Sequence, residues 1–173
     1  MPGRELFSGI GDSGLTGLIK AGRYPKSADV FEAIGALDEL DAFLSWIQTE
    51  QISATEHTIL TQVYADISAL MGEMAGNPEV ESVFSEEQVR WVEKTIEDLT
   101  RSIAMPTDFL SPGKNRLCAD FNLLRAISRR AERQVVRYFE NQPDADKQHI
   151  RSYLNRLSSL FFSLMLVHNA DKS

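Results

Sequence analysis

The sequence predicts an all-α protein of five helices, preceded by a glycine-rich N-terminal arm. From Val30 onward, apolar residues recur three or four positions apart, as they do on one face of a helix. No segment shows the regular alternation of a half-buried strand. Six of the ten glycines lie within residues 1–29, a density typical of a loop. A length of 173 residues suits one domain, so we expect a single domain over 1–173, with an arm at 1–29 and a helical bundle at 30–170.

The first helix is expected over about residues 30–52. Its middle is acidic, because Asp38, Glu39 and Asp41 follow one another closely. On a helical wheel Asp38 lies close to the apolar stripe, and a buried carboxylate is costly unless it is paired. We therefore expect Asp38 to be partly buried and to need a cationic partner.

Two further helices follow the first. The second is predicted over residues 54–75 and is stopped by Gly76-Asn77-Pro78. Ser85 then suits the N-cap of the third helix, with Gln88 in the capping-box position three residues later. We expect both helices to be ordinary amphipathic helices of the core.

The loop at residues 104–114 breaks the helical pattern with two prolines and a glycine. Phe109 and Leu110 are apolar residues within this loop. Such a pair either plugs the end of a core or lines a ligand pocket, and the loop by itself does not decide between the two.

The fourth helix, predicted over about residues 115–140, carries four arginines and one glutamate within residues 125–133. On a wheel, the residues that share one face are Arg125, Arg129, Glu132 and Arg133. The adjacent apolar face is formed by Phe121, Leu124, Ala131, Val135 and Phe139. Guanidinium groups carry a fixed charge and a fork of donors that matches phosphate oxygens, so this face suits an anion. A solvated charged face is the simpler interpretation of this helix on its own.

The fifth helix, predicted over about residues 145–168, is rich in Leu and Phe on most of its sides. We therefore expect it to be central and well buried. Asn155 and Arg156 interrupt its apolar surface. Polar groups in such a helix need hydrogen-bonding partners, so we expect both side chains to be paired.

The composition argues against several classes of protein. The net charge is −7, from 25 acidic and 18 basic residues, which is unlike a general nucleic-acid binder. The single Cys118 leaves no intrachain disulfide and no cysteine-rich metal site, and it fits a reducing compartment. No run of about 18 apolar residues is present, and the first residues carry no targeting signal. We therefore expect a cytoplasmic protein that binds neither nucleic acid nor membrane.

Within the arm, residues 8–17 alternate small residues with hydroxyl groups. Accessible backbone N–H groups and hydroxyls in such loops can wrap a phosphate, and Lys20 and Lys26 follow closely. The stretch lacks the Gly-x-x-x-x-Gly-Lys-Ser/Thr pattern of a P-loop. A phosphate-binding arm and a plain mobile arm are both compatible with this part of the sequence.

Four separated stretches carry a resemblance to a known family. They are Gly11-Asp12-Ser13-Gly14-Leu15-Thr16, Val30-Phe31-Glu32-Ala33-Ile34-Gly35-Ala36-Leu37-Asp38-Glu39-Leu40, Arg125-x-x-x-Arg129-Arg130-Ala131-Glu132-Arg133 and Tyr153-Leu154-Asn155-Arg156-Leu157-Ser158. In order and spacing they resemble the PduO-type ATP:cob(I)alamin adenosyltransferases, over about residues 7–168. The last two stretches are specific in combination.

This resemblance implies a five-helix bundle that assembles as a homotrimer with active sites between its subunits. Enzymes of the family are transferases that move the 5′-deoxyadenosyl group of ATP to the cobalt of a reduced corrinoid, cob(I)alamin. The products are adenosylcobalamin and triphosphate. Mg²⁺ is implied as a cofactor that binds through the triphosphate, without metal ligands from the protein. A reductase that supplies Co(I) and an adenosylcobalamin-dependent enzyme are implied as partners.

The resemblance also assigns roles to individual residues. Those expected around the triphosphate are Ser8, Gly9, Gly11, Asp12, Gly14, Thr16 and Lys26. Those expected to complete the ATP site are Arg129, Arg130, Glu132, Arg133 and Asn155. The residues expected to be catalytic are Phe109, Arg129, Asp38 and Arg125. Phe109 would stand under the corrin ring and keep a lower axial ligand off the cobalt. Asp38 would pair with the arginine equivalent to Arg125 across the subunit boundary.

The chain departs from the family pattern mainly on the corrinoid side. An Asp that usually follows Leu-Ser in the last helix is Ser159, an Arg further on is Leu166, and the C-terminal tail is short. A common His of the arginine-rich helix is Asn122. Two other interpretations therefore stay open: a non-catalytic ATP- or corrinoid-binding protein that delivers or senses the cofactor, and a helical interaction module without a ligand.

Overall fold

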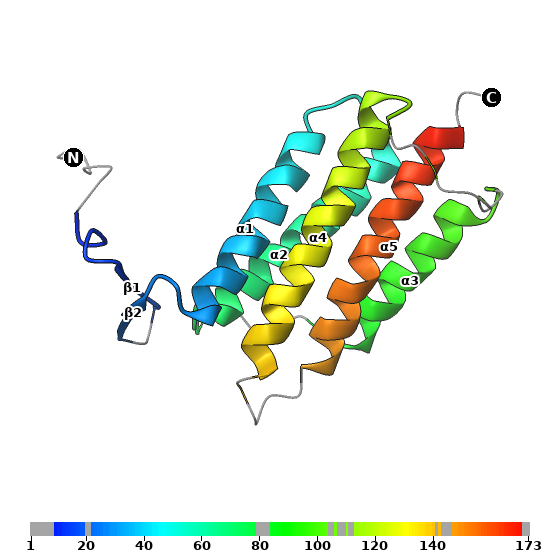
Figure 1. Cartoon of the computed structure of the whole chain (residues 1–173). Coiled ribbons are helices and arrows are strands. Elements are labelled where there is room, and N and C mark those ends of the chain that lie inside the picture. Colours follow the sequence, from blue (N-terminus) through cyan, green and yellow to red (C-terminus); the bar gives the residue numbers. More distant parts are fainter. Residues whose placement is uncertain are drawn as a thin grey trace, which may run out of the picture.

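The computed structural model describes residues 9–19, 22–78, 84–103, 113–140 and 147–170, together with Pro106, Leu110 and Gln142. Within these ranges five helices pack side by side, which confirms the predicted bundle (Figure 1). They are α1 (Asp29–Ile47), α2 (Ala54–Met74), α3 (Glu86–Thr100), α4 (Arg116–Glu140) and α5 (Gln148–Ala170). None of the helices in the described ranges is both long enough and apolar enough to span a membrane.

The prediction that the chain has no strand is wrong for the N-terminal arm. β1 (Leu15–Gly17) and β2 (Arg23–Pro25) form an antiparallel hairpin that projects beyond the start of α1 (Figure 1). Each strand has only three residues, which is too short for an alternating pattern to be recognised in a sequence. The N–H of Ile19 donates to the carbonyl of Ala75 over 3.1 Å, which ties the hairpin to the end of α2.

The ends of the helices follow local hydrogen bonds. Helix α1 stops at Ile47, earlier than predicted, because the N–H of Glu50 folds back onto the carbonyl of that residue over 3.0 Å. Helix α3 begins as predicted. The N–H of Ser85 donates to Oε1 of Gln88 over 3.0 Å, which completes the capping box.

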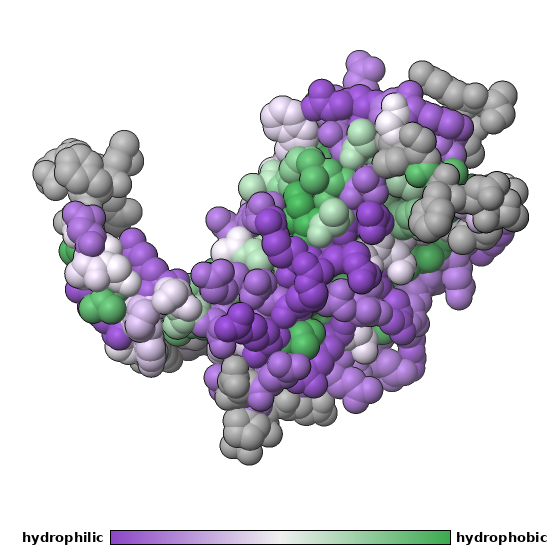
Figure 2. Space-filling view, in the orientation of Figure 1, coloured by the Kyte–Doolittle hydropathy of each residue, from purple (hydrophilic) through white to green (hydrophobic). Residues whose placement is uncertain are grey.

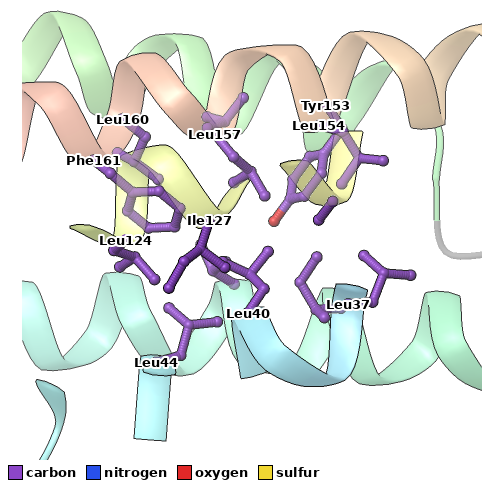
Figure 3. Packing of buried hydrophobic residues seen from close by; sticks show 14 of the residues in the cluster. Leu37, Leu40, Leu44, Leu124, Ile127, Tyr153, Leu154, Leu157, Leu160 and Phe161 are labelled. Atoms are coloured by element: carbon purple, nitrogen blue, oxygen red, sulfur yellow. The ribbon is translucent and has the colours of Figure 1, made fainter. Parts of the chain in front are cut away.

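Helix α4 packs against both α1 and α5, and α5 packs in turn against α3 (Figure 1). Leucines 37, 40 and 44 of α1 face Leu124 and Ile127 of α4 in the interior (Figure 3). The predicted apolar face of the fourth helix is confirmed, because Phe121, Leu124, Ala131, Val135 and Phe139 are all buried. The fifth helix is central as predicted, with Tyr153, Leu157 and Phe161 fully inside the core.

The prediction that Asp38 is partly buried is wrong for the single chain, where this side chain is exposed. The buried stripe of α1 runs through Leu37, Leu40 and Leu44, and Asp38 lies about 100° around the helix from Leu37. The half-buried carboxylate is Asp41 instead. Burial raises the pKa of Asp41, although its carboxylate accepts a hydrogen bond from Ser68 over 3.4 Å.

A buried carboxylate joins α2 to the end of α5. Glu56, at 5% exposure, lies in the first turn of α2 and accepts from the N–H of Ser53 over 2.7 Å. Its Oε1 lies 2.5 Å from Nε2 of His168. Burial alone would raise the pKa of Glu56, but the hydrogen bonds from His168 and Ser53 outweigh burial, and the pKa lies below its ordinary value of 4.5.

Replacing this carboxylate by an amide should reduce stability in a pH-dependent way. Because the pKa of Glu56 is lowered by folding, its contribution is complete above pH 4.5 and is lost as the pH falls through the folded pKa. Glu56→Gln should therefore lower the free energy of unfolding by about 1–3 kcal/mol at pH 7 and by less at pH 3. Urea unfolding at both pH values measures this. The exposed Glu97→Gln is the control, and an equal loss at both pH values would contradict the assignment.

Candidate functional site

The glycine-rich loop of the arm is closed by its own backbone. The N–H of Asp12 donates to the carbonyl of Gly9, and that of Gly14 to the carbonyl of Gly11, each over 3.1 Å. Gly9 and Gly14 have φ values of 66° and 76°, in the left-handed region that other residues rarely adopt. The path of this loop therefore requires glycine at both positions.

Lys26 lies over this loop. Its N–H donates to the carbonyl of Gly14 over 2.9 Å. Its Nζ lies 3.0 Å from the place where a Cβ on Gly11 would stand, so the absence of a side chain there makes room for the ammonium group. The structure thus brings together most of the residues that were predicted to surround the triphosphate. They are Gly9, Gly11, Asp12, Gly14, Thr16 of β1 and Lys26. Ser8, the remaining one, lies outside the described residues.

Arg23 is a part of this loop that the sequence did not predict. Its Nη2 donates to the carbonyls of Ile10 and Leu15, the latter over 3.2 Å. One guanidinium therefore holds the loop to the hairpin that carries it. The sequence contained no motif for this role, because a single arginine between a glycine and a tyrosine is typical of many exposed loops.

The arginines of α4 point away from the core. Arg125 is half-buried, and its Nε and Nη2 both donate to Oδ1 of Asn122, over 3.1 and 3.0 Å. Arg129 and Arg133 are exposed, and Nη1 of Arg133 donates to the carbonyl of Arg129 over 2.9 Å. Among the residues that the structure describes, the guanidinium of Arg129 has no hydrogen bond or ion pair. Neighbouring guanidinium groups repel one another, and an anion between them would relieve that repulsion.

On either side of this face, α4 is tied to a neighbouring helix. Arg130 forms an ion pair with Glu39 of α1. Glu132 accepts a hydrogen bond from Nδ2 of Asn155 of α5 over 2.9 Å. Arg156, next in sequence, pairs with Glu93 of α3 over 2.9 Å, so the expectation that both polar residues of the fifth helix are paired is confirmed.

A groove of about 810 Å³ runs between α1 and α4. Its walls are mostly apolar and include Trp46 and Leu123, which are 51% and 47% exposed. Figure 2 shows a hydrophobic patch over these two helices. The remaining lining residues are Glu39, Ala42, Phe43, Ala126, Ile127, Arg130 and Arg133. An exposed apolar surface beside arginines is typical of a binding site or a protein interface.

The structure does not bring the loop and the arginines of α4 together in one chain. The hairpin leaves the bundle at the start of α1, away from α4 (Figure 1). Phe109 lies outside the described residues, and its neighbour Leu110 is half-buried against the core. The predicted site is therefore divided between two places on one chain.

The chain is similar to known proteins over nearly its whole length. A family model described as cobalamin adenosyltransferase matches residues 6–168. A corrinoid adenosyltransferase of Bacillus subtilis is 29% identical over 171 residues, which cover 96% of this chain and 87% of that protein. The corrinoid adenosyltransferase PduO of Salmonella typhimurium is 27% identical over 171 residues, and the chain spans only 50% of its length.

A solved structure is similar over nearly the whole chain. It is a variant PduO-type ATP:corrinoid adenosyltransferase from Lactobacillus reuteri, complexed with cobalamin and ATP. Its TM-score to this chain is 0.81 at 25% sequence identity, and the match covers 95% of this chain and 91% of that one.

A methyl group on Gly11 should displace Lys26 without unfolding the protein. The clash at 3.0 Å is with the flexible end of the lysine, which can move away. Gly11→Ala should therefore change the free energy of unfolding by less than about 0.5 kcal/mol but weaken the binding of inorganic triphosphate several-fold. Gly22→Ala is the matched control, because a Cβ there meets nothing within 4 Å. Equal affinities of the two variants in calorimetry would argue against a role of Lys26.

Proposed function

Because the chain belongs to the cobalamin adenosyltransferase family, we propose that it transfers the 5′-deoxyadenosyl group of ATP to the cobalt of a reduced corrinoid. The products of this reaction are adenosylcobalamin and triphosphate. The observation that carries the proposal is the pair of cationic groupings, one with Lys26 over the arm loop and the other around Arg129 on α4. Together they supply amide, ammonium and guanidinium donors for a polyphosphate.

The chemistry asks little of the protein as an acid or a base. Co(I) is itself the nucleophile: its electron pair forms the bond to C5′ of ATP, and the bond from C5′ to oxygen breaks. The electron pair of that broken bond leaves on the triphosphate. The protein must therefore orient the reactants, which can lower a barrier by roughly 7–11 kcal/mol at best, and must stabilise the charge on the leaving group.

Lys26, the loop amides and the arginines of α4 suit the second task. Within the described part of the chain, the guanidinium of Arg129 makes no hydrogen bond or ion pair. Arg133 lies one turn further along α4, and Arg130 lies beside these two arginines and pairs with Glu39. Asn155, exposed on α5, would contact the same nucleotide. We propose that Mg²⁺ is carried by the triphosphate, where it neutralises part of the developing charge.

We propose that a second copy of the chain completes each site, in a homotrimer. The arm projects outward from the bundle (Figure 1), and the apolar groove between α1 and α4 offers a surface to bury (Figure 2). Asp38 is exposed on α1, and Arg125 has one described partner, Asn122, so both can pair across a boundary. A cytoplasmic location and partners that supply Co(I) or accept adenosylcobalamin stay predictions.

For the corrinoid side, we propose that Phe109 keeps a lower axial ligand off the cobalt. An apolar ring excludes water and ligands, and a four-coordinate Co(II) is easier to reduce. Two departures from the family pattern have different surroundings here. Leu166 is buried in the core at 2% exposure, whereas Ser159 is exposed on α5. Ser159 is therefore the departure that can alter a contact with the corrin ring.

The reaction can be tested directly. Purified protein, MgATP and chemically reduced cob(I)alamin should give adenosylcobalamin, which is followed by its absorbance. Release of one triphosphate per product would confirm the bond that breaks. Binding of both substrates without any product would instead identify a protein that delivers or senses the cofactor.

Loss of the Arg129 guanidinium should weaken nucleotide binding strongly. A hydrogen bond to a charged group contributes about 1.5–3 kcal/mol, so Arg129→Ala should raise the Kd for MgATP about ten- to hundredfold. Arg90→Ala is the control, because Arg90 is an exposed arginine that pairs only with Glu86 of its own helix among the described residues. Equal calorimetric affinities of the two variants would remove Arg129 from the site.

A charge in the apolar groove should prevent assembly. Leu123→Glu places a carboxylate on an exposed apolar residue of the groove, where burial against another copy would be costly. We expect light scattering to report monomers in place of trimers. Tyr64→Glu, at a comparably exposed position of α2, is the control. A Leu123→Glu variant that stays assembled would place the interface elsewhere.

A further inference from the structure

A chain of hydrogen bonds crosses three helices and has Asn155 near its centre. Glu93 of α3 accepts from Nε of Arg156 over 2.9 Å. Nη1 of the same arginine donates to Oδ1 of Asn155 over 2.9 Å. Nδ2 of Asn155 then donates to Oε1 of Glu132 of α4, also over 2.9 Å. The amide of Asn155 is therefore held at both of its ends.

The charges of the two neighbours fix which way this amide points. In the observed orientation the amide oxygen meets a cation and the amide nitrogen meets a carboxylate. A flipped amide would place N–H groups against the guanidinium and an oxygen against the carboxylate, and both contacts would be repulsive. Asn155 is exposed, so its second N–H and its second oxygen lone pair point in a fixed direction and remain available to a ligand.

At position 156, only an arginine side chain can donate to Glu93 and to Asn155 in this way. Nε of its guanidinium donates to Glu93, and Nη1 donates to Asn155. A lysine has a single ammonium group and cannot present donors in two fixed directions. Consecutive residues of a helix point about 100° apart, so the guanidinium must bend back to reach Asn155, and the bond from Nε to Glu93 holds it in that position.

We infer that Arg156 and Glu93 are positioning residues that fix the orientation of the Asn155 amide for the nucleotide. This inference rests on the proposed function, in which Asn155 binds ATP. It gives α3, which carries none of the predicted site residues, a part in nucleotide recognition.

The exposure of Arg156 and Glu93 allows both side chains to be replaced without loss of the fold. The side chains of Arg156 and Glu93 are 40% and 43% exposed, so their ion pair adds little to stability and its removal should leave the fold intact. Arg156→Met keeps much of the aliphatic stem but removes the charge and both donors. Arg90→Met is the matched control, because it removes an exposed arginine of α3 that pairs within its own helix.

Calorimetry with MgATP on the full chain should separate positioning from a general effect. Arg156→Met and Glu93→Gln should raise the Kd about three- to tenfold, and Arg90→Met should not. In an Asn155→Ala background the effect of Arg156→Met should disappear, because both changes act through one amide. An unchanged Kd for Arg156→Met, or the same loss in both backgrounds, would overturn the inference.

The side-chain amide of Asn155 gives a readout that needs no nucleotide. In protein labelled with ¹⁵N-asparagine, its signal is the one that Asn155→Ala removes. Arg156→Met should shift this signal toward those of freely rotating asparagines, and an unchanged signal would also overturn the inference. If the unmodified protein binds no MgATP, the proposed function fails, while the amide signal still decides whether Arg156 fixes Asn155.

Discussion

Helix α4 has to bury one side against both α1 and α5 while its arginines stay in solvent. Its apolar residues meet Leu37, Leu40 and Leu44 of α1 on one flank and the leucines of α5 on the other (Figure 3). A rotation of α4 by one residue, about 100°, would carry arginines into this core, where unpaired charges are very costly. The packing of apolar residues therefore sets the direction in which the cationic groups point.

Polar contacts between helices orient the side chains on the surface of α4, whose overall direction the apolar packing sets. Arg130 reaches Glu39 on the α1 side, and Glu132 reaches Asn155 on the α5 side. These contacts are exposed and contribute little to the free energy of unfolding. Their effect is on orientation, because each fixes a side chain whose direction the backbone leaves open. A bundle of this kind can thus have a stable core and a separate, finely oriented polar surface.

The helices could be predicted because a core face repeats along a helix, and this repeat is visible in one sequence. The same argument failed for β1 and β2, since three residues are too few to show any repeat. It also failed for Asp38, which lies about 100° around the helix from Leu37, whereas Asp41 lies about 40° from Leu37 and so next to the buried stripe. Contacts between residues far apart in the sequence, such as those of Arg23 within the arm or of Glu93 between α3 and α5, leave no local pattern at all. The family resemblance supplied roles, but the division of the site between arm and bundle required the structure.

The separation of the arm from the arginines of α4 has a thermodynamic consequence. In the proposed trimer a nucleotide touches two chains at once, so it binds the assembled protein more tightly than a lone chain. By linkage, the nucleotide must then favour assembly to the same extent. Dilution would separate the two halves of each site, and a rising concentration of nucleotide would rejoin them. The supply of ATP would thereby set how much of the protein is assembled, with no dedicated regulatory site.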